Sequence, residues 1–320
     1  MGGWQASDIP ALEGKTFIVT GADSGIGLEA TRVLVARGAH VIMACRHVDV
    51  GEAVAATLPA GKGRAEVRGL DLGSLRSVRA FAKALDPPVI DVLLNNAGVM
   101  LLPYGTTEDD FEQQFGINHL GHFALTSLLL PRILAAPRGR IVHVASLAHR
   151  HAHLDFDNLQ YTDTRGYTGF QAYARSKLAN LLFTFELQRR LEAAGERAIA
   201  LAAHPGVAAT NFGGRFAKHG LGGIARRIGH LFGQSAAEGA LPLLRATTAP
   251  DALGAEYYGA SQWRECRGPP ERVDATAEAH NCDIGRRLWE ASEAYTDEHF
   301  SSLSPCSSTH PLSDNGVRRH

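Results

Sequence analysis

The chain has 320 residues, 45% hydrophobic and 20% charged, a composition that suits a soluble protein with one large α/β domain or two small ones. The 32 Lys and Arg residues nearly balance the 33 Asp and Glu residues, which excludes the clearly basic face that a nucleic-acid partner needs. No run approaches the ~18 apolar residues of a membrane helix, and the N-terminus lacks the basic start and apolar core of an export signal. A small-molecule ligand is therefore expected.

Six short aliphatic or β-branched runs alternate with longer amphipathic stretches along the first two thirds of the chain. They lie at residues 15–21, 39–46, 65–72, 91–98, 139–146 and 198–206. Strands that alternate with helices in this way are typical of βαβ units. The sequence therefore predicts an α/β fold with a doubly wound parallel sheet.

The domain boundaries follow from changes in composition. No linker divides the chain before about residue 210, so we expect a single domain at 14–302 after an N-terminal extension at 1–13. The segment at about 211–235 is rich in Gly, cationic and aliphatic residues, which favours a helical substrate lid over a basic surface helix. The tail at 303–320 is rich in Ser, Pro and His, and we expect it to be disordered.

The segment "TGADSGIG" follows the first predicted strand and opens the first predicted helix. Glycines at Gly21, Gly25 and Gly27 leave room for backbone N–H groups and the helix N-terminus to approach a pyrophosphate, although a tight packing turn would also use them. The position after the first strand favours a dinucleotide site.

The choice between NADP(H) and NAD(H) depends on the end of the second predicted strand, "VIMACRH". An acidic residue there would bind the ribose hydroxyls of NAD(H), but this chain has Cys45 followed by Arg46. The Arg46 guanidinium suits a 2′-phosphate, so NADP(H) is favoured unless Arg46 is only a solvated charge. Asp71, after the third strand, would lie near the adenine or cap the next helix.

One predicted helix, "FQAYARSKLANLLFTFEL", carries a lysine inside an apolar stripe. Tyr173, Lys177, Leu181 and Phe185 are spaced so that they share one face of that helix. A phenol of pKa about 10 is a poor acid near neutrality. A positive charge at about 5 Å is worth roughly 3 kcal/mol, so we expect Lys177 to lower the pKa of Tyr173.

These motifs, in this order, resemble the short-chain dehydrogenase/reductase family. The resemblance covers roughly residues 14 to 210 and rests on "TGADSGIG", "NNAG", "GINHLGHF", "VAS", "YARSK" and "HPGVAAT". The segments "VIMACR", "NHLGHF" and "HLDFDNLQYTDTRGYTGFQ" are similar to the retinol-dehydrogenase-like branch. The inserted "DFDNLQ" explains why the gap between Ser146 and Tyr173 is longer than in most of the family. Basic residues that are sometimes found in the glycine turn of NADP-using members are missing here, and Ser24 stands in that turn instead.

The resemblance implies a Rossmann fold and an NADP(H)-dependent oxidoreductase that interconverts a lipophilic aldehyde or ketone and the matching alcohol. The implied catalytic residues are Asn118, Ser146, Tyr173 and Lys177. Tyr173 would be the acid/base, and Ser146 would hold the substrate oxygen. The backbone of Asn118 would anchor a water that leads protons to Lys177. The implied cofactor-binding residues are Gly21, Ser24, Gly25, Ile26, Gly27, Arg46, Asp71, Leu72, Asn95, Ala97, Gly98, Tyr173, Lys177, Pro205, Gly206, Val207 and Thr210.

Two other functions stay open. A carbon–carbon double-bond reductase resembling protochlorophyllide reductases would use a similar tyrosine and lysine, and only a substrate test separates it from a carbonyl reductase. A dinucleotide-sensing scaffold without turnover would need none of the four implied catalytic residues. Family members often pair through the helix that holds Tyr173, so a homo-oligomer is also left open.

The remaining motifs predict no metal site. The four cysteines form no CxxC pair, which argues against a zinc site or a disulfide framework and suits the reducing cytoplasm. His149, His151 and His153 alternate in "HRHAH" and could share one strand face around a metal, but a solvated loop at the rim of the site is favoured. We expect the isolated histidines to be structural: His40, His119, His122 and His143.

Overall fold

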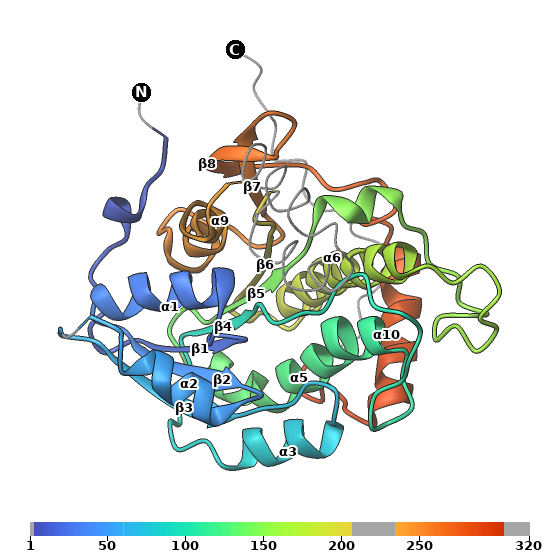
Figure 1. The fold of residues 1–320 in the computed structure, drawn as a ribbon, viewed down its shortest axis with the longest axis horizontal. Helices are drawn as coiled ribbons and strands as arrows, with labels where there is room; N and C mark the ends of the chain where they lie inside the picture. Colours follow the sequence, from blue (N-terminus) through green and yellow to red (C-terminus); the bar gives the residue numbers. More distant parts are fainter. Residues whose placement is uncertain (1–2, 60, 207–233, 304–320) are drawn as a thin grey trace, which may run out of the picture.

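The computed structural model describes residues 3–59, 61–206 and 234–303, which form a single α/β domain around one central sheet (Figure 1). In these residues the sheet has eight strands in the order β3-β2-β1-β4-β5-β6-β7-β8. All neighbouring strands are parallel except the antiparallel pair β7 and β8. The strands are β1 (Thr16–Thr20), β2 (His40–Cys45), β3 (Arg64–Gly69), β4 (Val92–Asn95), β5 (Arg140–Val144), β6 (Ile199–Ala203), β7 (Tyr257–Gln262) and β8 (Arg267–Arg272).

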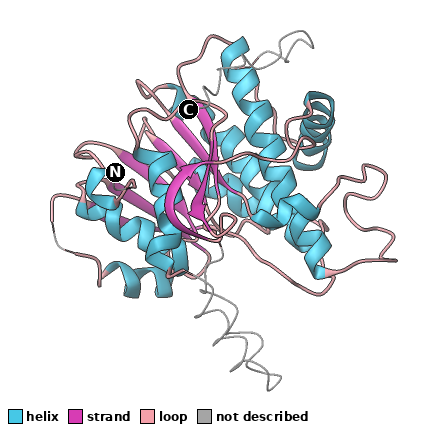
Figure 2. Cartoon of the chain, turned by 90° about the horizontal axis from the view of Figure 1, so that it is seen from above, coloured by secondary structure: helices cyan, strands magenta, loops and turns pink. Residues whose placement is uncertain are grey.

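Helices cover both faces of the sheet (Figure 2). One face packs against α1 (Gly25–Ala36), α2 (Val48–Ala55) and α9 (Ala236–Thr248). The other packs against α3 (Leu75–Lys83), α5 (Gly121–Leu134) and α6 (Gly169–Ala193), with α10 (Cys282–Thr296) outside α6. Short elements complete the set: the 3-10 helices η1 (Ala6–Asp8) and η3 (Leu147–His151), the single turn α4 (Gln113–Phe115) and the π-helix η2 (Gly116–Leu120).

The doubly wound parallel sheet and all six predicted strands are confirmed. β1, β4 and β5 are central strands, and their continuous aliphatic runs are buried because helices cover both faces of a parallel sheet. The strands β7 and β8 were not predicted. β8 carries Pro269 and Pro270, which lack a backbone donor and are tolerated in a strand only where it forms an edge, as it does here.

The ends of the domain differ in detail from the expected boundaries. Ile9 and Leu12 of the N-terminal extension are buried in the core beside α1 and α9. Leu303, which the sequence places in the tail, is also buried in the core. Of the predicted lid, 211–233 lies outside the described residues, as does the tail from 304. Ser235, at the end of the predicted lid, caps the N-terminus of α9.

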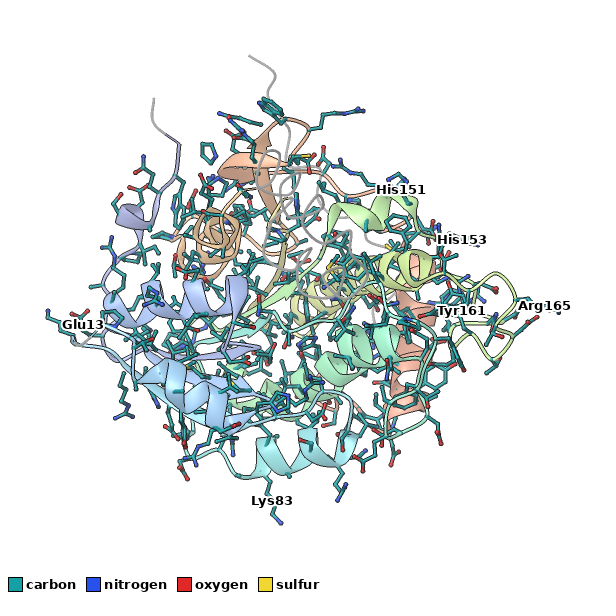
Figure 3. The ribbon with its side chains drawn as sticks, in the orientation of Figure 1. Glu13, Lys83, His151, His153, Tyr161 and Arg165 are labelled. Carbon is teal, nitrogen blue, oxygen red and sulfur yellow. The ribbon has the colours of Figure 1, made fainter. Side chains whose placement is uncertain are left out.

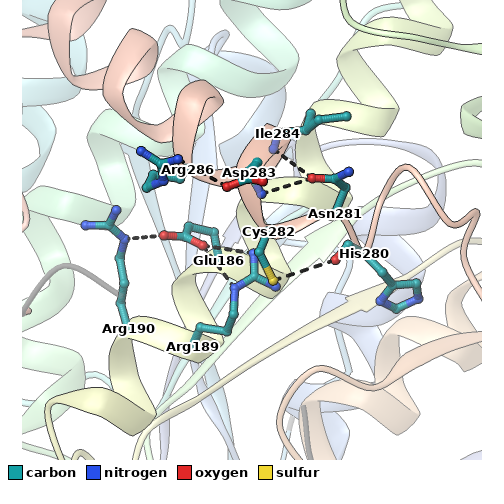
Figure 4. Close-up of polar contacts among 9 residues, drawn as sticks. All are labelled: Glu186, Arg189, Arg190, His280, Asn281, Cys282, Asp283, Ile284 and Arg286. Atoms are coloured by element: carbon teal, nitrogen blue, oxygen red, sulfur yellow. Dashed lines mark hydrogen bonds and ion pairs between the residues drawn. The ribbon is translucent and has the colours of Figure 1, made fainter. Parts of the chain in front are cut away.

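A buried ion cluster joins α6 to α10 (Figure 4). Glu186 accepts from Arg189 at 2.8 Å and from Arg190 at 2.7 Å, and the Glu186 side chain is only 1% exposed. The Arg190 guanidinium also lies 4.1 Å from the ring centre of Trp289 on α10. Gly285 marks the close approach of the two helices, because an added Cβ would lie 2.8 Å from an Arg189 nitrogen. One carboxylate thus pairs with two buried guanidinium groups.

Replacing Glu186 with Gln should therefore destabilise the fold strongly. The substitution leaves two buried cations without their counter-charge, and we expect the free energy of unfolding to fall by about 3 to 5 kcal/mol in urea denaturation. Glu290→Gln is the matched control, because its carboxylate is 60% exposed where it meets Arg286, and it should change stability by less than about 0.5 kcal/mol. Equal stability of the two variants would contradict this role of Glu186.

Candidate active site

A cleft of about 650 Å³ opens at the carboxyl ends of the parallel strands, where the loops after β1 and β4 diverge. This is the point at which the strand order reverses, and open α/β sheets bind ligands at such points. Most predicted site residues line this cleft: Gly21, Ser24, Gly25, Ile26, Gly27, Arg46, Asp71, Leu72, Ala97, Gly98, Ser146, Tyr173, Lys177, Pro205 and Gly206.

The glycine turn between β1 and α1 brings bare backbone to the cleft. Gly21 and Gly25 have φ of +64° and +54°, a left-handed backbone that favours glycine. At Gly27 an added Cβ would lie 2.3 Å from the Gly21 carbonyl oxygen, so no side chain fits. The Ser24 side chain makes no capping hydrogen bond at the start of α1 among the described residues. The first N–H groups of α1 are thus available to an anion, as a dinucleotide pyrophosphate requires.

At the far end of β2 the cleft is bordered by a cation rather than an acid. Cys45 is fully buried, and burial raises the pKa of its thiol to about 12, so it stays neutral. Arg46 is exposed, lines the cleft and donates from Nε to His47 at 3.3 Å. His47 also lines the cleft, and the sequence analysis did not include it. Asp23, in the glycine turn, also lines the cleft, and its negative charge contributes to the raised pKa of Cys45.

Asp71 and the residues after β4 complete the floor. Asp71 lines the cleft and accepts from the Gly73 N–H at 2.9 Å, whereas the cap of α3 is Ser74. Asn95 does not line the cleft: it is buried and donates to Thr126. Its neighbour Asn96 lines the cleft instead and donates from Nδ2 to the Thr20 carbonyl at 2.8 Å. A one-residue shift along a strand turns a side chain to the opposite face, and sequence spacing alone does not resolve it.

Ser146, Tyr173 and Lys177 meet in the same cleft from two different elements. Ser146 follows β5 and begins η3, and its side chain is hydrogen-bonded to Tyr173. Lys177 lies one turn after Tyr173 on α6, with its Nζ 5.7 Å from the tyrosine ring centre. The lysine is 4% exposed and donates to the Val144 carbonyl at 2.8 Å. The predicted apolar row is confirmed, since Leu181 and the residues beyond it are buried.

The charge states of these groups are set mainly by burial. Burial raises the pKa of Tyr173, and the hydrogen bond with Ser146 opposes that rise without cancelling it. The expected lowering of the Tyr173 pKa by Lys177 is therefore wrong for the protein chain alone. Burial also lowers the pKa of Lys177 to about 8, because its ammonium has left water. Lys177 thus titrates close to neutral pH.

Asn118 is buried behind the cleft rather than exposed in it. Its side chain accepts from the Val99 N–H at 2.8 Å and donates to the Val99 carbonyl at 2.9 Å and to Ser176 at 2.8 Å. It lies in the π-helix η2, and its backbone carbonyl is 3.0 Å from Nδ1 of His122. An added Cβ on Gly98 would lie 3.0 Å from Asn118 and 3.5 Å from the Lys177 ammonium, so these three residues are neighbours.

The histidines of "HRHAH" do not share one face. His149 is fully buried, whereas His151 lines the cleft beside Phe170 and the His153 side chain is 68% exposed. Figure 3 shows His151 and His153 on the side of the molecule that also carries the projecting loop with Arg165. Within residues 3–59, 61–206 and 234–303, no group of three or more His, Cys, Asp or Glu could hold a metal ion.

One part of the cleft lining is mainly apolar, and the sequence analysis did not identify it. Its residues come from the loop after β4, from η3 and from the start of α6: Met100, Leu101, Leu147, Ala148 and Phe170. Phe170 is 43% exposed although it is aromatic. These residues are close together only because the two strand ends and the helix meet at the same edge of the sheet. Val207 and Thr210, which were also predicted, lie outside the described residues.

The chain is similar to a known family and to named proteins. A family model described as short chain dehydrogenase matches residues 15–158. Retinol dehydrogenase 13 of Homo sapiens is 41% identical over 291 residues, which span 88% of this chain and 84% of that protein. Retinol dehydrogenase 11 of Homo sapiens is 39% identical over 288 residues, which span 88% of this chain and 85% of that protein.

A solved structure agrees with these matches. An uncharacterized protein from Mycobacterium paratuberculosis superimposes with a TM-score of 0.78 and 42% identity, covering 93% of this chain and 99% of that chain. None of the helices described in the present structure is both long and apolar enough to cross a membrane. Together with the glycine turn and the Ser146, Tyr173 and Lys177 group, these similarities show that the chain belongs to the short-chain dehydrogenase/reductase family of oxidoreductases, in its retinol-dehydrogenase-like branch.

Proposed function

We propose that the protein is an NADP(H)-dependent oxidoreductase that reduces a lipophilic aldehyde or ketone, or oxidises the matching alcohol. The observation that carries this proposal is the meeting of Ser146, Tyr173 and Lys177 in the same cleft as the glycine turn. When a carbonyl carbon accepts a hydride, a proton donor, a hydrogen-bonding hydroxyl and a cation are the protein groups that protonate and stabilise its oxygen.

The residues of the cleft fit a nicotinamide dinucleotide. The bare backbone at Gly21 to Gly27 would hold the pyrophosphate, and Lys177 lies beside Gly98, where it can donate to a ribose hydroxyl. When bound, the reduced cofactor would supply the hydride that the carbonyl carbon accepts. No other redox group is needed for this reaction.

The chain's own residues would handle the oxygen and the proton. The Tyr173 hydroxyl would give its proton to the carbonyl oxygen, and the Ser146 hydroxyl would hold that oxygen while negative charge develops on it. The positive charge of protonated Lys177, close to the Tyr173 ring, would stabilise the phenolate that is left on Tyr173. In the oxidation of an alcohol the same residues would act in reverse.

The preference for NADP(H) is supported by the charges at the end of β2. A buried neutral thiol, Cys45, stands where an acid would favour NAD(H), and the exposed Arg46 offers donors to a 2′-phosphate. The proposal of a lipophilic substrate is supported by the apolar part of the cleft lining, which includes Met100, Leu147 and Phe170. The relatives are named for retinol, itself a lipophilic alcohol.

Arg46→Ala should weaken NADPH binding much more than NADH binding. A lost charge-assisted contact with phosphate is worth about 1.5 to 3 kcal/mol, which corresponds to roughly a 10- to 100-fold higher Kd. Fluorescence titration of the purified protein with each nucleotide measures both values. Arg32→Ala is the control, because Arg32 lies on α1 outside the cleft lining. Equal affinity of the wild-type protein for both nucleotides would overturn the NADP(H) preference but not the enzyme proposal.

Tyr173→Phe should abolish carbonyl reduction, whereas Ser146→Ala should reduce kcat by about a hundredfold. The first variant removes the proton donor, and the second removes one hydrogen bond to the developing oxyanion, worth about 3 kcal/mol. NADPH oxidation with a panel of lipophilic aldehydes and ketones measures kcat, and NADPH titration checks that both variants still bind the nucleotide. An unchanged rate in Tyr173→Phe would rule out this tyrosine as the acid.

The value of kcat/KM for NADPH should fall as pH rises above about 8. Because the Lys177 pKa is lowered to about 8, the ammonium is charged below that pH and loses its charge above it. A pH profile of NADPH-dependent carbonyl reduction tests this. Lys177→Arg keeps the charge across the range, so its profile should stay level whatever its absolute rate. A level wild-type profile up to pH 10 would contradict the assignment.

A further inference from the structure

A group of three polar side chains, of which His204 is fully buried and the other two are partly exposed, lies next to the cleft and takes no part in the mechanism above. It joins three segments that are distant in sequence: the 3-10 helix η3 after Ser146, the loop at Pro205 and Gly206, and the turn between β7 and β8. The first two segments line the cleft, whereas the turn does not. The side chains that connect them are Arg150, His204 and Glu265.

Glu265 makes the two bonds that hold this group together. One carboxylate oxygen pairs with Arg150 of η3 at 2.6 Å, and the other lies 3.1 Å from Nε2 of His204. Burial alone would raise the pKa of Glu265, but the hydrogen bonds from His204 and Arg150 outweigh burial and hold that pKa below its usual value. The carboxylate is therefore ionised and accepts from both partners.

The orientation of His204 follows from its second ring nitrogen. Nδ1 is 3.1 Å from the Gly206 N–H and must accept from it, so the proton is on Nε2 and is donated to Glu265. The ring is fully buried, and Gly259 of β7 makes room for it, because an added Cβ there would lie 2.0 Å from Nε2. His204 thus links the Glu265 carboxylate, through two hydrogen bonds, to the backbone of Gly206, which lines the cleft.

The η3 side of the cleft is oriented in the same way by His149. Its Nε2 accepts from the Thr276 N–H at 3.3 Å, so its Nδ1–H donates to the Ser146 carbonyl at 2.7 Å. Burial lowers the pKa of His149 to about 4, which keeps this ring neutral. Arg150 follows His149 directly, so its bond to Glu265 restrains the short helix that Ser146 begins.

The backbone of the turn is itself unfavourable without these contacts. Trp263, Arg264 and Glu265 have φ of 52°, 56° and 65°, and three successive non-glycine residues in the left-handed region are rare. The turn also packs directly on the loop beside the cleft, since an added Cβ on Gly206 would lie 2.5 Å from the Cys266 carbonyl oxygen. Of these three residues, Glu265 is held from outside the hairpin, through Arg150 and His204.

We propose that Glu265 is a positioning residue that ties the Ser146 side of the cleft to the Gly206 side through Arg150 and His204. It touches none of the reacting groups. It sets the distance between two walls of the cleft: one carries the Ser146 hydroxyl beside Tyr173, and the other carries the backbone of the predicted cofactor-binding residues Pro205 and Gly206. The kinetic part of this inference rests on the proposed function, whereas the structural part does not.

Hydrogen exchange of the protein without added nucleotide tests the structural part. In Glu265→Gln the ion pair with Arg150 is lost, and we expect faster amide exchange both in η3 and at the N–H groups of His204 and Gly206. Glu256→Gln is the matched control: this carboxylate also lies at the β7 and β8 hairpin, is 13% exposed and pairs with Arg272, but it contacts neither wall of the cleft. Unchanged exchange in Glu265→Gln, or the same change in both variants, would overturn the proposal.

Steady-state kinetics test the positioning part in the same variants. We expect Glu265→Gln to lower kcat/KM for carbonyl reduction by about tenfold or more, since small displacements of reacting groups are costly. Arg150→Gln should do the same, the double variant should be no worse than either single one, and Arg150→Lys should recover most of the activity. Glu256→Gln should stay near the wild-type value.

The outcomes separate this inference from the proposed function. Faster exchange with unchanged kinetics would show that the tie exists but does not position catalytic groups, and would overturn that role. Additive losses in the double variant would mean that Arg150 and Glu265 act separately, which also contradicts it. If the wild-type protein reduces none of the carbonyls tested, the proposed function fails, and the exchange comparison still decides whether Glu265 ties the two walls.

Discussion

The geometry of the cleft depends on one buried ammonium group, that of Lys177. Its donation to the Val144 carbonyl joins the middle of the longest helix to the end of a central strand. Asn180, one turn further along α6, donates to the same carbonyl at 3.2 Å. Because Ser146 follows Val144 by two residues and Tyr173 precedes Lys177 by one turn, this attachment brings the two hydroxyl groups together. Burial destabilises the charged form of Lys177, but the position of its ammonium orients Ser146 and Tyr173 beside it.

The polar core behind Lys177 is held neutral. His119, His122 and His143 are fully buried, burial lowers the pKa of each, and each finds a hydrogen-bond partner on another element or turn. The rings of His119 and His143 also pack against Phe183, and the His119 ring packs against Phe123 as well. Neutral imidazoles give directional contacts without adding positive charge near Lys177, so they are compatible with a lysine that must itself carry the charge.

The C-terminal third of the described chain supports the cleft from outside the nucleotide-binding core. α10 packs along α6 and contributes Trp289, and the β7 and β8 hairpin reaches the walls of the cleft through Glu265. Neither element supplies a reacting group. Both restrain elements that do, which is consistent with catalytic groups being held by surrounding packing and hydrogen bonds rather than by their own rotamer preferences.

The sequence by itself determined the alternation of strands and helices, the glycine turn, and the Tyr173 and Lys177 pair, because each depends on local spacing along one element or one turn. It did not reveal β8, whose prolines fit only an edge position, nor Asn96 in place of Asn95, which depends on the register of β4. The sign of the Tyr173 pKa shift, the separation of the three alternating histidines and the bridge through Glu265 were decided by tertiary structure alone. Burial and contacts between distant segments create these properties, and neither is encoded in any single stretch of residues.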